Sequence, residues 1–281
     1  MAIMSLKELN DMRILEILEN DGTGPVSHKL CFISANSTGG TSFSGRARNL
    51  FLVRPGKREE LPPGSAALAA SFGELAGNMF LSVGEDALFR VRSDFSPFPL
   101  LSVERSGFIC LSERASLLRP LSVGILTVSD KGSRGERTDL SGPALADEVR
   151  RIGGDVEESR VVPDDQETIA EVLRLWCDRK GLCLILCTGG TGLSRRDVTP
   201  EALESVAIKR VPGFGEVMRS VSMASTPMAI LSRCCAVTRG QTLIVALPGS
   251  VKGAMECFSA IEPALRHGIG ILRGWDGECG A

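Results

Sequence analysis

Histidine is scarce in this chain, which has two, His28 and His267, among its 281 residues. Two histidines supply no cluster with the ligand spacing of a zinc site and little material for a serine or cysteine triad. We therefore expect chemistry that does not depend on histidine. Each of the two is expected to be an ordinary surface residue or a hydrogen-bonded core residue.

An excess of charge of either sign is also missing, because 32 Lys and Arg face 34 Asp and Glu, for a net charge of −2. Without a global positive field to attract phosphate backbones, a general nucleic-acid-binding function is not expected. No apolar run approaches the ~18 residues that cross a bilayer. Residues 1–12 have the pattern of an amphipathic helix rather than of a signal peptide. The sequence thus predicts neither a nucleic-acid partner nor a membrane partner.

The cysteines follow no disulfide or metal-binding pattern. There are nine of them, an odd number, and no CxxC motif occurs. Cys183 and Cys187 lie within apolar runs, where a thiol behaves as a small core side chain. These features predict free thiols and a reducing, cytoplasmic location.

The chain is long enough for two domains, and its two parts differ in the pattern of apolar and turn-forming residues. From residue 26 to 118, short apolar runs alternate with turn-forming residues, which is typical of a small β-rich domain. From residue 120, apolar strands alternate with amphipathic helices, as in an α/β fold whose helices cover both faces of a mainly parallel sheet. The expected domains are residues 1–119, to which no family or role is assigned, and residues 120–281.

Apolar runs and helical periodicity place the expected elements. The runs in the first domain are at residues 30–33, 50–53, 79–83, 87–91 and 108–111. The strands expected in the second domain are at residues 122–128, 156–162, 182–187 and 242–247. Apolar side chains at i, i+3, i+4 and i+7 predict helices over residues 166–179 and from about Ser250 onward.

A glycine-rich loop, TGGTGLSRRDVTPE at 188–201, follows the third of these strands in the second domain. Glycines permit close backbone approach to an anion, Arg195 and Arg196 can offset phosphate charge, and Asp197 can bind the cation that accompanies a nucleotide. The simpler alternative is a glycine turn before a helix that Thr199 caps. The loop has neither the GK[ST] of a P-loop nor the GxGxxG of a dinucleotide-binding turn.

Three further loops, at residues 128–132, 162–166 and 247–250, are expected at the same sheet edge, where helix N-termini favour anions. Two of their residues have a purely structural alternative. Asp164 can cap the next helix, with Glu167 completing a capping box, and Ser250 can be either a helix cap or a phosphate ligand. A second TGGT, at residues 38–41, has no aspartate at a comparable distance and is assigned no function.

Taken in order, these strings resemble the MogA/MoaB family of molybdopterin adenylyltransferases, which includes the G domains of gephyrin and its plant counterpart. The resemblance spans residues 121–272. It rests on VSDK at 128–131, VPDD at 162–165, TGGTG at 188–192, RRDVTPE at 195–201, PGFGE at 212–216 and LPGS at 247–250. Val251 stands where the family usually has proline, which affects only the start of a helix.

The resemblance implies a molybdopterin-binding fold and the transfer of AMP from ATP to molybdopterin, with release of pyrophosphate and the help of Mg²⁺. It implies Asp164 and Asp197 as the catalytic carboxylates and the magnesium ligands. The residues that it implies for binding pterin and phosphate are Ser129, Asp130, Lys131, Gly189, Gly190, Thr191, Gly192, Arg195 and Ser250. It further implies a homo-oligomer, with a trimer favoured, and allows a molybdenum insertase as a partner.

Two other functions stay open. Nucleotide pyrophosphatases of the CinA type share this fold, although the surroundings of PGFGE and LPGS match them less well. A non-catalytic pterin-binding or scaffold module is the other, and the two intact carboxylates Asp164 and Asp197 argue against it. Molybdenum insertases carry the same module within much longer chains.

Overall fold

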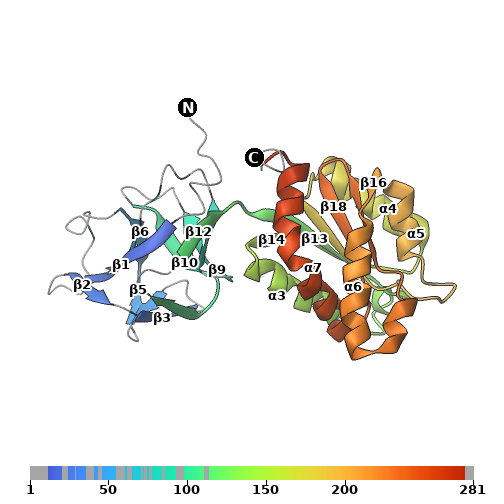
Figure 1. Ribbon diagram of the computed structural model, residues 1–281, viewed down its shortest axis with the longest axis horizontal. Helices are drawn as coiled ribbons and strands as arrows, with labels where there is room; N and C mark the ends of the chain where they lie inside the picture. Colours follow the sequence, from blue (N-terminus) through green and yellow to red (C-terminus); the bar gives the residue numbers. More distant parts are fainter. Residues whose placement is uncertain are drawn as a thin grey trace. The chain divides into compact units, whose positions relative to one another are not determined.

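The structure is a computed structural model, which describes residues 12–20, 25–28, 30–35, 41–43, 46–54, 61, 65–70, 72, 75, 78–83, 86–92, 98–110 and 114–275. The chain divides into two compact units, Met1–Pro120 with Arg150–Gly153 and Leu121–Val149 with Gly154–Ala281. Figure 1 colours them along the sequence, the first from blue to green and the second from green to red. The amphipathic helix expected at residues 1–12 lies outside the described residues except for Met12, which begins a strand.

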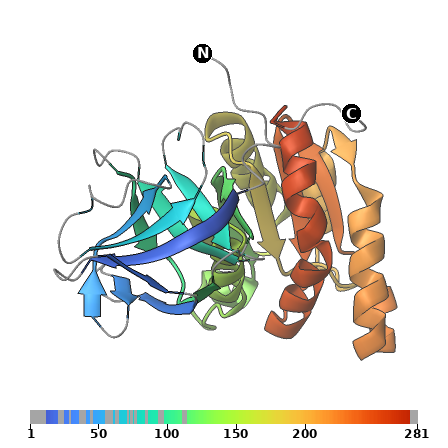
Figure 2. The same cartoon turned by 60° about the vertical axis from the view of Figure 1, so that its left-hand side comes forward.

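Strands are the regular elements that the structure describes within residues 12–120 (Figure 2). They are β1 (Met12–Asn20), β2 (Pro25–His28), β3 (Leu30–Ala35), β4 (Thr41–Phe43), β5 (Arg46–Arg48), β6 (Leu50–Val53), β7 (Ser65–Ala70), β8 (Met79–Val83), β9 (Asp86–Arg92), β10 (Leu100–Val103), β11 (Gly107–Cys110) and β12 (Arg114–Leu118). The larger sheet has the order β12-β8-β9-β10-β6-β7-β1-β2, and β1 also pairs with β12, so the sheet closes on itself as a barrel. A second sheet has the order β11-β3-β4-β5.

Apolar side chains from these strands form the core of the first unit, among them Ile14, Leu52, Leu68 and Phe89. All five apolar runs noted in the sequence overlap strands. The Ala-rich strand β7, whose residues are all buried, gave no such signal, because alanine is depleted in strands and its small side chain marks no apolar run.

The second unit is an α/β fold built on one six-stranded sheet (Figure 1). In spatial order its strands are β14 (Gly154–Val162), β13 (Leu121–Val128), β15 (Leu184–Thr188), β18 (Thr242–Leu247), β17 (Cys235–Arg239) and β16 (Lys209–Arg210). The first four are parallel, and β17 and β16 are antiparallel additions at one edge. The expected fold, a mainly parallel sheet with helices on both faces, is confirmed.

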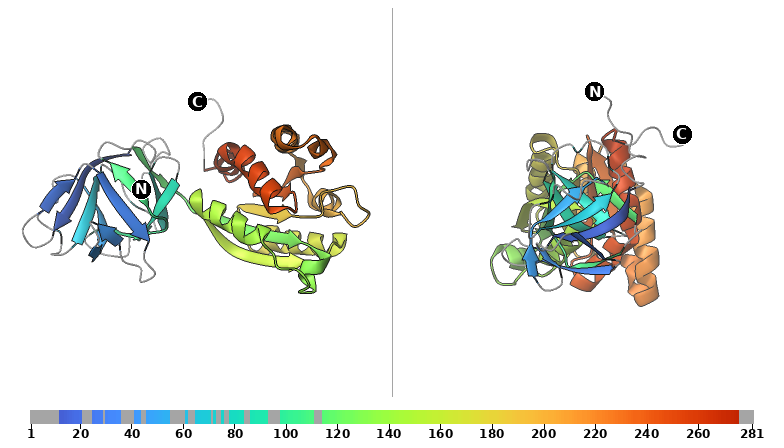
Figure 3. Two further views of the ribbon diagram at one scale, coloured as in Figure 1. Left: turned by 90° about the horizontal axis from the view of Figure 1, so that it is seen from below. Right: turned by 90° about the vertical axis from the view of Figure 1, so that its left-hand side faces the viewer.

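Helices follow the parallel strands and cover the sheet (Figure 3). They are α2 (Asp130–Ser133), α3 (Ser141–Arg151), α4 (Gln166–Arg174), the π-helical turn η2 (Leu175–Arg179), α5 (Thr199–Val206), α6 (Pro212–Ser225), the 3-10 turn η3 (Pro227–Leu231) and α7 (Val251–Leu272). The helix expected over residues 166–179 is thus α4 continued by η2. Within the described residues, no helix is both long and apolar enough to cross a bilayer.

Successive residues of each central strand face opposite sides of the sheet, and both sides are buried. On one side, Leu126, Ile185 and Ile244 pack with α4 and α5 around Trp176, which is fully buried. Gly124 makes room for that indole, because a Cβ there would lie 2.6 Å from Trp176 Cε3. Helices α6 and α7 contact each other, and α6 also contacts β17 while α7 contacts β18. This packing fixes the strand ends from which the functional loops start.

Candidate functional site

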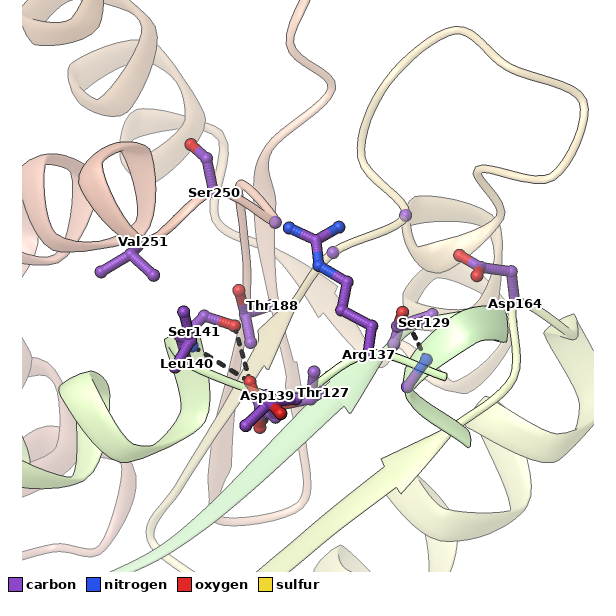
Figure 4. A pocket seen from close by; sticks show the side chains of 16 residues that line it. Thr127, Ser129, Arg137, Asp139, Leu140, Ser141, Asp164, Thr188, Ser250 and Val251 are labelled. Carbon is purple, nitrogen blue, oxygen red and sulfur yellow. Dashed lines mark hydrogen bonds between the residues drawn. The ribbon is translucent and has the colours of Figure 1, made fainter. Parts of the chain in front are cut away.

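Four loops meet at the carboxyl edge of the parallel strands, as expected from the sequence (Figure 4). The backbone N–H of Ser129, after β13, donates to the carbonyl of Val162, where β14 ends, at 2.8 Å. Thr188, at the end of β15, donates from Oγ1 to the Pro248 carbonyl after β18 at 2.8 Å. Hydrogen bonds between these loops therefore hold residues far apart in the sequence in one cluster.

A cavity of about 380 Å³ opens between these loops. Five of the residues predicted for the site line it, namely Ser129, Asp164, Gly189, Gly190 and Ser250. The lining does not include the other predicted residues, which are Asp130, Lys131, Thr191, Gly192, Arg195 and Asp197. The predicted residues thus contribute glycine backbone, two hydroxyl groups and one carboxylate to the cavity wall.

The glycine loop needs glycine at two positions. Gly189 and Gly190 have φ values of +106° and +63°, which side chains rarely tolerate. A Cβ on Gly189 would lie 2.2 Å from the Val128 carbonyl oxygen, and one on Gly190 would lie 2.4 Å from Thr199 Oγ1. The close approach of these backbones leaves the loop's peptide groups at the cavity wall.

Thr199 fixes this loop instead of capping a helix. Its Oγ1 donates to the Gly189 carbonyl at 2.7 Å, and its N–H donates to the Gly190 carbonyl at 3.1 Å. Helix α5 begins at Thr199 itself, and Val198 occupies the cap position without a side-chain bond. The predicted capping role of Thr199 is therefore wrong, because its hydroxyl is used by the turn before it.

Asp164 is likewise not a helix cap. The neighbouring Asp165 caps α4 and accepts from the Thr168 N–H at 2.9 Å, so the capping alternative for Asp164 is wrong. Asp164 Oδ2 accepts from the Asp130 N–H at 2.7 Å, and Asp130 Oδ1 accepts from the Asp164 N–H at 3.1 Å. Burial raises the pKa of Asp164, and the charges of Asp130 and Asp197 raise it further.

Arg196 neutralises Asp130. Its Nη2 and Nε donate to the two carboxylate oxygens at 2.7 and 3.0 Å, which lowers the pKa of Asp130. The sequence suggested that Arg196 offsets phosphate charge, whereas here it ties the glycine loop to the start of α2. Arg196 is thus a bridge between two loops of the site.

Asp197 is not among the residues that line the cavity. Its Oδ2 accepts from the Ser194 N–H at 2.9 Å and would lie 2.8 Å from a Cβ on Gly192. It is close enough for its charge to raise the pKa of Asp164. In both aspartates one carboxylate oxygen accepts a backbone hydrogen bond, while Oδ1 has no hydrogen-bonding partner among the described residues.

Two free carboxylate oxygens suit Mg²⁺ in particular. Mg²⁺ commonly takes one or two protein carboxylates and completes its octahedron with water and substrate phosphates. No group of three or more acidic, histidine or cysteine side chains able to hold a metal occurs in the part of the chain that the structure describes. The donor set therefore fits a cation that arrives with a nucleotide better than a permanently caged metal.

The remaining predicted residues differ in their surroundings. Thr191 is buried, with Cys234 Sγ 3.8 Å from its Oγ1, and the Gly192 carbonyl accepts from Arg233 Nε at 2.7 Å. Lys131 and Arg195 are exposed, and their side chains make no hydrogen bond or ion pair with the described residues. Of these four predicted residues, Thr191 and Gly192 are held in place by contacts with described residues.

Two charged residues that the sequence did not point to also line the cavity, Arg137 and Asp139. Asp139 accepts from the N–H groups of Ser141 and Gly142, both at 3.0 Å, and so satisfies the first turn of α3. An aspartate shortly before Ser141 and Pro143 is a helix-start signal that could have identified it. Arg137 has no comparable signal, since an exposed arginine fits any loop.

Residues 124–267 match the model of a family described as a probable molybdopterin binding domain. The chain is 38% identical over 159 residues to the molybdopterin adenylyltransferase of Helicobacter pylori, a match that covers 56% of this chain and 90% of that protein. It is 40% identical over 158 residues to the molybdopterin adenylyltransferase of Escherichia coli K12, covering 54% of this chain and 81% of that one.

Solved structures agree with these sequence matches. The molybdopterin biosynthesis enzyme MoaB of Thermus thermophilus superposes with a TM-score of 0.53 at 49% identity, covering 56% of this chain and 99% of that one. The molybdopterin biosynthesis Mog protein of Mycobacterium ulcerans gives a TM-score of 0.52 at 32% identity, with 54% and 99% covered. Both matches span nearly the whole of the solved chain and just over half of this one.

Proposed function

Since the chain belongs to the family of probable molybdopterin binding domains, we propose that its second unit is a molybdopterin adenylyltransferase, which transfers AMP from ATP to molybdopterin and releases pyrophosphate. One observation supports this most strongly. The part of the chain that matches adenylyltransferases at 38% identity over 159 residues and 40% over 158 residues brings Asp164 and the glycine loop together at one cavity. A phosphate-transfer site needs such a combination of backbone donors and carboxylates.

The reaction makes modest demands on acid–base chemistry. A phosphate nucleophile is already anionic at neutral pH, so no strong general base is needed to activate it. The scarcity of histidine is then no obstacle. Positioning of the phosphates and neutralisation of their charge are the main tasks of the protein.

The roles proposed for the residues follow from where they lie. Asp164 and Asp197 would hold Mg²⁺ through their free oxygens, and the bound ion would neutralise and orient the phosphates. The backbone of Gly189 and Gly190 and the hydroxyls of Ser129 and Ser250 would bind phosphate and pterin groups at the cavity wall. Further binding roles are proposed for Asp130, Thr191 and Gly192, which shape the adjoining loops, and for the exposed Lys131 and Arg195.

We also infer a homo-oligomer, with a trimer favoured. Large apolar side chains are exposed on η3 and at the glycine loop, including Leu193, Met228 and Ile230, each more than 60% accessible. Such a patch supports burial against another copy. A molybdenum insertase is the other partner proposed.

The cysteines whose side chains the structure describes are free thiols, which supports a reducing compartment such as the cytoplasm.

The test is enzymatic. Purified protein mixed with ATP, Mg²⁺ and molybdopterin is expected to release pyrophosphate and to form adenylylated pterin, followed by chromatography and mass spectrometry. Cleavage of ADP-ribose-like nucleotides without any pterin would instead favour a pyrophosphatase. Tight pterin binding without turnover would favour a non-catalytic module. Light scattering of the same preparation measures the oligomeric state.

A further inference from the structure

The cavity needs positive charge that the predicted site residues do not bring to it. Two carboxylates, Asp139 and Asp164, line it, and its substrates under the proposed function are polyanions. Among the lining residues, all of which the structure describes, Arg137 has the only positively charged side chain. Among the side chains of the lining, Arg137 is therefore the one that can offset phosphate charge alongside a bound cation.

Other cations near this edge are engaged elsewhere or lie outside the lining. Arg196 forms a bidentate ion pair with Asp130. Arg134 donates to Glu136 at 2.9 and 3.3 Å. Arg137 makes no ion pair and no hydrogen bond with any residue that the structure describes. Figure 4 shows its side chain extending across the cavity, with the guanidinium between Ser250 and Asp164.

The backbone that presents Arg137 is anchored close by, at Asp139. Asp139 Oδ2 accepts from Thr127 Oγ1 at 2.7 Å, which ties the segment to the end of β13. Its Oδ1 accepts from Ser141 and Gly142 at the start of α3. Because both oxygens are occupied by these donors, Asp139 leaves Arg137 available to a ligand.

We propose that Arg137 is a phosphate-binding residue of this cavity, so that a substrate phosphate binds between its guanidinium and the backbone of Gly189 and Gly190. A guanidinium is always charged and presents paired N–H donors that match two phosphate oxygens. Arg137 is exposed and has no partner among the described residues, so it gives up no interaction with them when it binds phosphate. The identity of the substrates rests on the proposed function. ATP and molybdopterin both bring phosphate, so the shared chemistry is a phosphate oxyanion.

The experiment measures binding without turnover in the full-length protein. Calorimetry gives the affinity for Mg·ATP without pterin and for molybdopterin without nucleotide, in wild type and in Arg137→Gln, Arg137→Lys and Arg134→Gln. The last is the matched control, since it removes the same charge from the same loop outside the cavity. Equal melting temperatures establish that each variant is folded.

Arg137→Gln is expected to weaken one of the two ligands by at least about tenfold, and the weakened ligand identifies the phosphate that is bound. Arg137→Lys is expected to recover part of the loss, because charge is kept but the paired geometry is not. Arg134→Gln is expected to change neither affinity by more than about twofold.

Unchanged affinity for both ligands in Arg137→Gln would overturn the proposal, as would an equal loss in Arg134→Gln or failure of the wild type to bind either ligand. Failure of adenylyl transfer alone is a separate result. Wild-type protein that binds ATP or molybdopterin through Arg137 but forms no adenylylated pterin would refute the proposed function and leave the phosphate contact standing.

Discussion

In the first unit most neighbouring strands run antiparallel around a barrel, whereas the four central strands of the second run parallel. Antiparallel strands send their connecting loops to both ends of a sheet, but parallel strands bring all their carboxyl ends to one edge. Asp164, Gly189, Ser250 and Arg137 come from four such loops and line one cavity. The difference teaches that topology, more than composition, decides where side chains of distant segments can act together.

The TGGT tetrapeptide appears in both units and illustrates the same contrast. At residues 188–191 it follows the buried strand β15, and its second residue packs against the Val128 carbonyl of the neighbouring β13. At residues 38–41 the first three residues lie outside the described part of the chain, and Thr41 begins β4. At residues 188–191, the end of a parallel strand brings the motif to the other loops of the site.

The largest expected effect tests whether function is confined to the second unit. Asp197→Asn and Asp164→Asn should each lower adenylyl transfer by about 100-fold or more, because neutral oxygens hold Mg²⁺ and align phosphates poorly. Pyrophosphate release measures the loss, with circular dichroism to verify folding. Arg92→Gln, an exposed position on β9, is the control in the first unit and should turn over like wild type. A folded Asp197→Asn enzyme with full activity would remove that residue from the mechanism.

A smaller effect is expected from the backbone of the glycine loop. Gly190→Ala places a Cβ 2.4 Å from Thr199 Oγ1 at a φ of +63°, and we expect a loss of about 2 kcal/mol in unfolding free energy and impaired turnover. Gly213→Ala, in the first turn of α6 with nothing within 4 Å of the added atom, should be neutral or stabilising by up to about 1 kcal/mol. Urea titrations and turnover assays compare the pair. Equal behaviour would mean that the strained turn is unnecessary.

Removing the first unit should change turnover little, which sharpens the comparison further. The solved MoaB of Thermus thermophilus is covered over 99% of its length by just over half of this chain, so the α/β module exists as a separate protein. A chain of residues 120–281 is therefore expected to fold cooperatively and to form adenylylated pterin within a few-fold of the full-length rate. Loss of activity in a folded fragment would show that the first unit takes part in the reaction.

Sequence patterns predicted the second unit well and its site in part. Continuous apolar runs gave β13, β15 and β18, because a strand buried on both faces leaves such a run. The edge strand β14 carries charged residues and is largely exposed. Which aspartate caps α4 depends on a register of one residue, so Asp164 and Asp165 could not be told apart from the motif alone. The role of Arg137 was beyond prediction, since an exposed loop arginine gains meaning only from the cavity that it reaches.

The smallest expected effect concerns an ion pair that joins η2 to β17, Asp178 with Arg239, whose Nη2 and Nε donate at 2.7 and 2.9 Å. The hydrogen bonds from Arg239 lower the pKa of Asp178 in the folded state. In the unfolded state the pKa of an aspartate is about 3.9, so folding favours the ionised carboxylate. The stabilisation is present at neutral pH and is lost as the pH falls below about 4 through the lowered value. Because the aspartate is nearly half exposed, Asp178→Asn should cost less than about 1 kcal/mol at pH 7. Urea unfolding should show this difference shrinking as the solution is acidified.

The Arg90–Glu104 pair of the first unit, at 3.0 Å with side chains only 16% and 25% exposed, is less screened by solvent, so Glu104→Gln should cost more unfolding free energy at pH 7 than Asp178→Asn. The reverse order would mean that burial does not govern these pairs.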